Sequence, residues 1–297
     1  MGLSALPKVD VPCPVCKSVK YRVMYPDTLG ERLPEFGYDF SPRHNDSYQV
    51  VRCEGCGHAY CSPVPKDIDG NYADVEDPEY LKNSRQRINT AEKVVPVIRR
   101  FKPAGTLLDV GCATGDFLGV ASRYFAVEGL ELSNWAAQIA SRGGFTVHRM
   151  RLSDLRTDAR YDAVTLWGVI EHFDDPGLEI GEIHRLLRPG GVVCLWTGDV
   201  DSMLSRLLGR RWWYVQGQHI QLFSRRSIDK LFVDRGFARR AMLTYPYVMT
   251  LRSLAKSLGR YRILGAAARA LLDNATVGEW KVTFRLPGEM LAIYEKI

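Results

Sequence analysis

Thr106-Leu-Leu-Asp-Val-Gly-Cys-Ala-Thr-Gly115 begins as a short apolar run and ends in a turn that contains two glycines. Glycine permits sharp turning and lets a ligand approach the backbone closely, so Gly111 and Gly115 mark a candidate binding loop. Glu131 follows Gly111 by twenty residues and ends the next predicted strand. A carboxylate at that place can accept hydrogen bonds from both hydroxyls of a ribose. Because ligands of open α/β sheets bind beyond the carboxyl ends of the strands, the stretch predicts a nucleoside site.

The sequence around this stretch alternates between predicted strands and predicted helices. The predicted strands span 106–110, 127–131, 145–149, 161–167, 191–197, 238–246 and 289–296. The predicted helices span 114–126, 133–142, 175–187 and 224–236, and begin near the capping residues Ser133, Asp175 and Ser224. Such alternation is typical of an α/β fold with a doubly wound, mostly parallel sheet.

The glycine turn does not fit two common nucleotide-binding loops. Ala113 stands where a dinucleotide fingerprint would place its middle glycine, and no Walker A lysine follows Gly115. The leading carboxylate, Asp109, is unfavourable for a phosphate and favourable for the cationic tail of an amino acid.

Five of the seven cysteines lie within the first 61 residues. Cys13 and Cys16 form one C-x-x-C pair, and Cys53 and Cys56 form a second. The two-residue gap lets both thiolates of a pair reach one metal ion, and two such pairs complete a tetrahedral site. Four protein ligands leave no open position, so the pattern predicts a structural zinc rather than a catalytic one. The alternative is two accidental pairs of buried thiols.

These patterns divide the chain into three parts. Residues 1–70 are predicted to form a small zinc ribbon, whose metal substitutes for a sufficient core. Residues 71–104 are predicted to be a linker helix with a kink or break at Pro96. Residues 105–297 are predicted to form the nucleoside-binding domain. Within it, helical patterns such as Ile263–Leu272 either cover a second substrate or make a homodimer contact.

Composition excludes several other classes of protein. Hydrophobic residues make up 46% and charged residues 25% of the chain, which is ordinary for a globular protein and excludes wholesale disorder. No window holds the roughly 18 uninterrupted apolar residues of a membrane span, and the first residues lack a signal-peptide core. We therefore expect a cytoplasmic protein. The net charge of +6 is dispersed, which permits an anionic partner without requiring one.

At this point the sequence resembles the class I S-adenosylmethionine-dependent methyltransferases. Asp109–Gly115 is similar to the first motif of that family, and Glu131 is similar to its ribose-binding acid. Asp154-Leu155 resembles the pair that flanks the adenine. Trp167–Pro176 resembles the motif after the fourth strand, and Leu186–Gly191 resembles the turn before the fifth.

The resemblance covers about residues 105–297 and implies both a fold and a donor site. It implies a seven-stranded sheet that ends in a hairpin of 238–246 and 289–296, with the last strand antiparallel. It implies S-adenosyl-L-methionine as the methyl donor. The residues that it implies for the donor site are Asp109, Gly111 and Gly115 around the methionine part, Glu131 at the ribose, and Leu132, Asp154 and Leu155 at the adenine, together with Cys112 and Trp167.

The order of a C-x-x-C…C-x-x-C ribbon before such a domain resembles a bacterial group of small-molecule methyltransferases. Many members of that group serve polysaccharide, sugar-modification or secondary-metabolite pathways. The segment Arg211–Phe223 resembles the acceptor side of that group, and its aromatic residues either line an acceptor pocket or pack as a lid. The expected partner is a small-molecule acceptor that carries a sugar or a phosphate. Arg210 and Arg211 either pair with such a phosphate or form a solvated surface pair.

Two histidines are candidates for catalysis. Methyl transfer to an oxygen usually needs a base that takes the proton, and histidine is the natural choice near neutral pH. His219 lies in the aromatic segment and His172 follows the fourth strand, so each is a candidate base. The alternative for His172 is that it orients its loop or packs, and Glu171 is expected to brace the same loop.

Two other functions compete with small-molecule methyl transfer. The first is an RNA methyltransferase whose ribbon grips RNA, but the dispersed charge makes nucleic acid an unlikely partner. The second is a non-enzymatic protein whose ribbon docks on a partner while the larger domain senses the cofactor. The complete donor motif argues against this second function.

Overall fold

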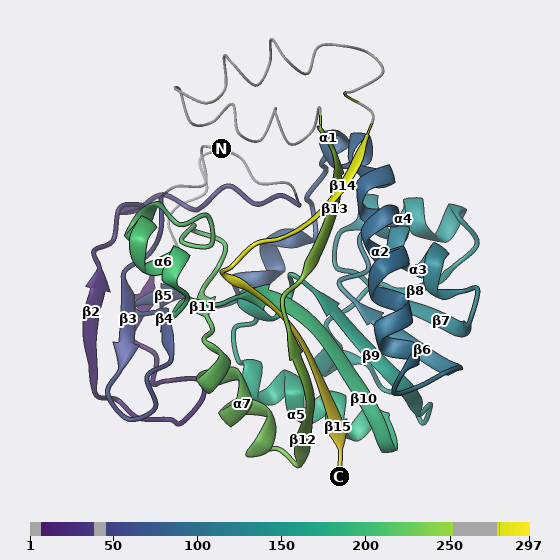
Figure 1. Ribbon diagram of the computed structural model, residues 1–297. Helices are drawn as coiled ribbons and strands as arrows, with labels where there is room; N and C mark the ends of the chain where they lie inside the picture. The colour runs from purple at the N-terminus through teal and green to yellow at the C-terminus, as the bar shows by residue number, and fades with distance from the viewer. Residues whose placement is uncertain (1–6, 39–45, 252–277, 279) are drawn as a thin grey trace.

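A seven-stranded sheet forms the centre of the computed structural model, which describes residues 7–38, 46–251, 278 and 280–297 (Figure 1). Its strands are β6 (Gly105–Val110), β7 (Phe125–Leu130), β8 (Thr146–His148), β9 (Tyr161–Trp167), β10 (Leu187–Gly198), β12 (Phe237–Leu243) and β15 (Glu289–Lys296). They lie in the order β12-β15-β10-β9-β6-β7-β8. Strand β15 is antiparallel to both neighbours, whereas the pairs from β10 to β8 are parallel. The predicted doubly wound, mostly parallel sheet with an antiparallel last strand is confirmed.

Helices cover both faces of this sheet because its strands are apolar on both sides. The helices are α1 (Pro78–Lys82), α2 (Ser84–Arg99), α3 (Asp116–Ala121), α4 (Asn134–Arg142), α5 (Pro176–Leu186), α6 (Met203–Leu208) and α7 (Arg225–Val233). Successive residues of a strand point to opposite faces. Accordingly, Val193 and Leu195 of β10 join the core under α5 and α7, and Val192 and Cys194 join the core under α2 and α3.

The predicted capping residues begin their helices as expected. The Ser133 hydroxyl accepts a hydrogen bond from the backbone amide of Ala136, and the Asp175 carboxylate accepts from two amides of α5. Ser224 and Ser227 form a reciprocal capping box at the start of α7. Each cap satisfies amides that the first helical turn leaves without partners.

The segment predicted as one linker helix consists of two helices. The interruption lies at Asn83, between α1 and α2, and α2 continues through Pro96 to Arg99. Of the two predicted alternatives at Pro96, the break does not occur and the kink stays a prediction. Proline this close to the end of a helix removes a single backbone hydrogen bond, and the buried side chains of Val94, Val95 and Ile98 hold the last turns on the sheet.

The cysteine-rich part of the chain forms a second, smaller sheet beside the first (Figure 1). Its strands are β2 (Tyr21–Tyr25), β3 (Val50–Cys53) and β4 (Ala59–Cys61). A fourth strand, β11 (Gln221–Leu222), comes from the larger domain and pairs antiparallel with β4. The strands β1 (Lys8–Val9) and β5 (Val64–Pro65) form a separate antiparallel pair. The ribbon is thus joined to the larger domain by a shared sheet.

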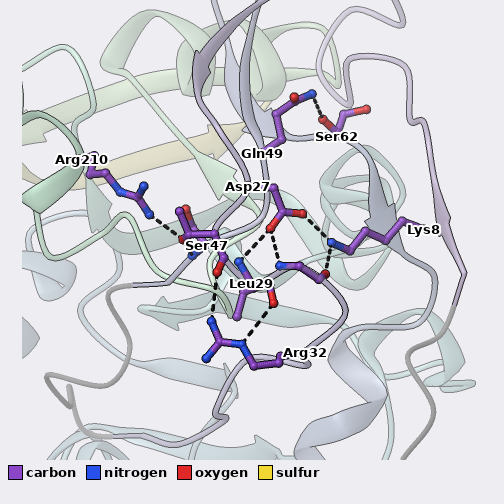
Figure 2. A network of polar contacts seen from close by, with 10 residues as sticks. Lys8, Asp27, Leu29, Arg32, Ser47, Gln49, Ser62 and Arg210 are labelled. Atoms are coloured by element: carbon purple, nitrogen blue, oxygen red, sulfur yellow. Dashed lines mark hydrogen bonds and ion pairs between the residues drawn. The ribbon is translucent and has the colours of Figure 1, made fainter.

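Buried side chains strengthen this junction. His58 of the ribbon is fully buried, and its ring nitrogens lie 3.0 Å from Gln221 Oε1 and 3.2 Å from Ser227 Oγ. On the other side of the ribbon, Arg210 Nη2 donates a hydrogen bond of 2.6 Å to Thr28 Oγ1. Figure 2 shows the Arg210 side chain reaching the polar network around Asp27. Arg210 therefore ties the two domains together rather than standing as a solvated surface residue.

Two further strands form an antiparallel pair that the sequence patterns did not predict. It consists of β13 (Pro246–Thr250) and β14 (Lys281–Arg285). The predicted helical stretch Ile263–Leu272 lies outside the described residues. Among the described helices, none has the length and apolar character that a membrane crossing requires.

Candidate functional site

A cavity of about 1090 Å³ opens at the carboxyl ends of β6, β7 and β9. The strand order reverses between β6 and β9, and open α/β sheets bind their ligands at such a reversal. Segments from both domains line the cavity, including residues 35–38 of the ribbon and residues 213–219 after β10. The predicted site residues Asp109, Gly111 and Glu131 all lie on its wall.

The binding loop after β6 depends on glycine at two positions. Gly111 has φ +69°, and a Cβ atom there would lie 2.5 Å from Val169 Cγ2. Gly115 has φ +85° and begins α3 as its N-cap. Ala113 between them adopts φ +46°, an uncommon backbone conformation for a residue with a side chain. Gly111, Cys112 and Ala113 of the loop line the cavity, whereas the predicted site residue Gly115 does not.

Glu131 is fixed by three hydrogen bonds at the end of β7. Its Oε2 accepts from the backbone amide of Ala113 at 2.9 Å, which links it directly to the glycine loop. Its Oε1 accepts from the amide of Ser133 at 2.8 Å and from the hydroxyl of Tyr38 at 2.9 Å. The ribbon residue Tyr38 was not anticipated from the sequence, because no local pattern links position 38 to position 131.

Asp109 lies at the other end of the same loop and is 1% exposed. Burial raises the pKa of its carboxyl group to about 8, although a 2.6 Å hydrogen bond from Thr165 Oγ1 favours the ionised form. The negative charge of Glu131 raises the pKa further. A cationic ligand group in the cavity would reverse this effect, because an opposite charge stabilises the carboxylate.

The residues predicted to flank an adenine do not all reach the cavity. Leu132 lines it, whereas Asp154 is exposed to solvent and Leu155 is buried in the core, away from the lining. Met150 and Leu152 line that side instead. Neither Asp154 nor Leu155 lines the cavity, so their roles at the adenine stay predictions.

The two candidate histidines meet on the opposite side of the cavity. The rings of His172 and His219 are 4.7 Å apart and nearly perpendicular. His172 Nδ1 lies 2.9 Å from the carbonyl oxygen of Gln218, and His219 Nδ1 lies 3.0 Å from that of Tyr214. A carbonyl only accepts hydrogen bonds, so we assign the proton of His219 to Nδ1, and its Nε2 then accepts from the side-chain amide nitrogen of Gln216, 2.7 Å away. His172 is hydrogen-bonded to the backbone of both Gln218 and Gly168. Burial lowers the pKa of His172 to about 4, so this imidazole is neutral at physiological pH.

Aromatic and acidic side chains complete this acceptor side. Trp213 and Tyr214 of the aromatic segment line the cavity, which agrees with the pocket alternative, and Trp167, predicted for the donor site, lines it as well. Trp212 and Phe223, from the same segment, are instead buried in hydrophobic cores. Glu289, at the start of β15, also lines the cavity and was not predicted. A charged residue that opens the apolar strand Glu289–Lys296 is the sequence signal that could have drawn attention to it.

The four cysteines of the ribbon converge as the spacing predicted. The Sγ atoms of Cys13, Cys16, Cys53 and Cys56 all lie within 4.8 Å of one another. Two Sγ–Sγ distances, Cys13 to Cys56 and Cys16 to Cys53, are 3.5 Å. Bonds of about 2.3 Å in a tetrahedral zinc site give a sulfur–sulfur separation of about 3.8 Å, so the cluster fits zinc.

Comparison with known proteins identifies the class of the domain. A family of proteins described as "Methyltransferase domain" matches residues 83–241, more than half of the chain. The chain therefore belongs to the methyltransferase domain family, and its recognition as a class I S-adenosylmethionine-dependent methyltransferase domain is confirmed.

Individual relatives are distant and match only in part. Malonyl-[acyl-carrier protein] O-methyltransferase of Serratia marcescens is 29% identical over 167 residues, which are 53% of this chain and 64% of that protein. Ubiquinone biosynthesis O-methyltransferase of Alkalilimnicola ehrlichii is 34% identical over 117 residues, 35% of this chain and 46% of that protein. The chain thus spans about half to two thirds of the curated relatives it matches.

A solved structure from Thermotoga maritima, described as a possible histamine N-methyltransferase, has the same fold. It has a TM-score of 0.50 and 19% sequence identity, and the match covers 77% of this chain and 97% of that one. At this identity the likeness concerns the fold alone.

Proposed function

We propose that this protein transfers a methyl group from S-adenosyl-L-methionine to a small-molecule acceptor bound in the cavity. The observation that carries the proposal is the pair of buried carboxylates beside the glycine loop, Asp109 on β6 before it and Glu131 after β7. Asp109 suits the amino-acid part of the donor, and Glu131 suits its ribose. The acceptor classes that we favour are a sugar, a polysaccharide precursor or a secondary metabolite. The name of one curated relative, a ubiquinone biosynthesis O-methyltransferase, is compatible with a small-molecule acceptor.

The residues of the loop fit the donor because they leave room and supply polar partners. The glycine at position 111 lets the loop pack against Val169 beside the cavity, and Glu131 is held by the amides of Ala113 and Ser133. When bound, S-adenosyl-L-methionine supplies a methyl group that its sulfonium already activates. The task of the chain is therefore to align the acceptor with that methyl group and to exclude water.

His219 and His172 are the residues that we expect to handle the proton of the acceptor. The basic nitrogen of His219 is Nε2, because its Nδ1 faces a backbone carbonyl, and an acceptor that uses this nitrogen would displace the Gln216 amide that lies 2.7 Å from it. The T-shaped contact between the two rings restricts both imidazoles to one region of the cavity. A phosphate handle on the acceptor gains no support from Arg210 or Arg211, since neither lines the cavity.

We also propose a structural zinc ion at Cys13, Cys16, Cys53 and Cys56. With four thiolate ligands, the ion would hold the ribbon and leave no position for a substrate. The ribbon in turn holds residues 35–38 at the cavity.

Donor binding is tested by titrating S-adenosylhomocysteine into the full chain in a calorimeter. We expect Glu131→Ala to weaken binding by on the order of tenfold or more, because a charged hydrogen-bond acceptor for the ribose is lost. Glu92→Ala, which removes an exposed carboxylate outside the cavity, is the matched control and should leave the affinity unchanged. Equal affinities for the Glu131 variant and the wild type would refute the donor site.

Acceptor class is tested by the release of S-adenosylhomocysteine with two pools of substrate, a small-metabolite extract and bulk RNA. We expect release with the first pool only. His219→Ala should abolish that release and spare donor affinity, and an unchanged turnover number would remove the assignment of His219. Release with RNA alone would replace this function by RNA methylation.

A further inference from the structure

The cavity is acidic, although the chain as a whole carries a net charge of +6. Carboxylate side chains outnumber basic ones on its wall, and the basic lining residues are Lys82, Arg87 and Arg151. Each of these three is engaged in an ion pair, Lys82 with Glu79, Arg87 with Asp116 and Arg151 with Asp67. The donor accounts for part of this charge through Asp109 and Glu131, but not for the carboxylates on the acceptor side.

Glu289 is the first of two such carboxylates. It is 1% exposed, and three neutral donors hold it: Trp196 Nε1 at 2.6 Å and the Tyr247 hydroxyl at 2.6 Å on Oε2, and Trp213 Nε1 at 3.1 Å on Oε1. A carboxylate has about four lone-pair sites, so the described donors leave one site on Oε1. Neutral donors orient the charge without cancelling it. The aromatic rings that they belong to form the surrounding wall.

Glu171 is the second carboxylate and is 2% exposed. The Thr197 hydroxyl donates to its Oε2 at 3.0 Å. Burial raises the pKa of Glu171 to about 8, and the negative charge of Glu289 contributes to that rise. Burial likewise raises the pKa of Glu289 to about 7. Without a cation nearby these raised pKa values favour the protonated, neutral forms, whereas a positively charged occupant of the cavity would hold both groups as carboxylates.

Polar groups without partners lie in the same part of the cavity. Within the described part of the chain, the Tyr214 hydroxyl and Gln216 Oε1 are buried and have no hydrogen-bond partner, and both residues line the cavity. Tyr214 and Gln216 are only 4% and 5% exposed. Buried polar groups are nearly always satisfied, so such groups in a cavity wall indicate a ligand that satisfies them. An acceptor oxygen such as Gln216 Oε1 requires a donor on that ligand.

We propose that the acceptor side of the cavity is a subsite for an organic ammonium group, held between Glu289 and Glu171 and walled by the aromatic rings around Tyr214. This proposal deepens the proposed function, on which it rests, by naming the chemical class of the acceptor. An ammonium group supplies several N–H donors for the two carboxylates and for Gln216 Oε1. The faces of tryptophan and tyrosine attract a cation as well.

A metal ion is the competing cation. Glu171, His172 and His219 each offer a ligand atom, and these atoms lie within 4.8 Å of one another. The aromatic wall favours the organic cation, because tryptophan and tyrosine rings stabilise an ammonium group and supply no ligand to a divalent ion. Glu289, whose oxygens accept hydrogen bonds from the indoles of Trp196 and Trp213, is not one of these three potential metal ligands.

The test measures the affinity of two probes for the full chain loaded with S-adenosylhomocysteine. Benzylamine is a cation at pH 7.5, and benzyl alcohol is its neutral counterpart of nearly equal shape. We expect benzylamine to bind about tenfold tighter, in line with one charged hydrogen bond in a buried site. Glu289→Gln should remove most of this preference, and Glu182→Gln, which removes a carboxylate outside the cavity lining, should retain it. Retained binding of S-adenosylhomocysteine by Glu289→Gln separates this result from a failure of the donor site.

Two results would overturn the proposal. One is equal affinity for the two probes in the wild type, and the other is an unchanged preference in Glu289→Gln. If that variant fails to fold, Glu171→Gln decides by the same criterion. A third arm adds Mn²⁺. If the ion displaces benzylamine, and if His172→Ala abolishes binding of the ion, the subsite holds a metal and the proposal of an ammonium site is refuted.

Discussion

Replacing Tyr38 by phenylalanine should increase the affinity for the donor, although it removes a hydrogen bond. The Tyr38 hydroxyl donates to Glu131 Oε1 at 2.9 Å, and the Ser133 amide already occupies the other site of the same oxygen. Glu131 Oε2 accepts from the Ala113 amide. Each carboxylate oxygen has about two acceptor sites, so only one site remains for the two hydroxyls of a ribose. The tyrosine therefore competes with one ribose hydroxyl.

The expected change in donor affinity follows from the strength of the hydrogen bond between Tyr38 and Glu131, which competes with the ribose. A hydrogen bond to a charged group contributes about 1.5–3 kcal/mol, and part of that is regained when the tyrosine bonds to water instead. We expect the affinity for S-adenosylhomocysteine to rise by on the order of three- to tenfold in Tyr38→Phe, since 1.4 kcal/mol corresponds to about tenfold. The free energy of unfolding without ligand should fall at the same time, by about 1 kcal/mol.

Calorimetry with two nucleosides isolates the competition. Adenosine should bind more tightly to Tyr38→Phe than to the wild type, whereas 2′,3′-dideoxyadenosine should bind both equally, because it has no hydroxyl for Glu131. Tyr25→Phe, on β2 and outside the cavity lining, is the matched control. A loss of adenosine affinity in Tyr38→Phe would mean that the tyrosine assists the donor, and the reasoning from acceptor sites would be wrong.

Three further predictions concern the metal, the loop and pH. Cys53→Ser should lose the single zinc ion per chain in native mass spectrometry, whereas Cys194→Ser, within the large sheet, should keep it. Gly111→Ala should lower the free energy of unfolding, measured in urea, by about 2–4 kcal/mol, because a side chain there strains the left-handed backbone and its Cβ lies 2.5 Å from Val169. Adding Val169→Ala should recover the part of this loss that the contact with Val169 causes. The pKa of His172 is lowered to about 4, so its contribution is complete above pH 6.5 and is lost as pH falls toward 4. His172→Asn should therefore reduce the acid destabilisation in this window, by at most about 3 kcal/mol, and an unchanged pH profile would contradict the lowered pKa.

The larger fold was predictable because its signals are local. Strand β9 coincides with the predicted range 161–167, and the caps at Ser133, Asp175 and Ser224 begin their helices as expected. Each of these signals depends on residues within one element. Of the kink or break predicted at Pro96, the break does not occur, because packing of α2 on the sheet outweighs the local cost of proline.

Long-range features were missed for the opposite reason. Strand β11 has two residues, and its pairing with β4 brings together positions more than 150 residues apart, which no periodicity reveals. Tyr38 and Glu289 reach the cavity in the same way, from distant parts of the chain. Asp109 and Glu131, in contrast, could be predicted because a strand and the following turn fix their positions relative to the glycine loop.

The placement of Tyr38 bears on what the ribbon does. A ribbon that only gripped RNA or docked on a partner would have no reason to reach the donor site. Here the ribbon shares a sheet with the larger domain through β11, and it buries His58 against Gln221. The amide of Gly37 donates to Gln218 Oε1, and the carbonyl of Gln218 in turn faces His172. The ribbon thus touches both ends of the cavity, the ribose side through Tyr38 and the histidine side through Gln218. We infer that a zinc ion at the four cysteines acts on the cavity through the ribbon. Its removal should therefore lower the stability of the fold and, by releasing Tyr38 from Glu131, raise donor affinity in the same direction as Tyr38→Phe.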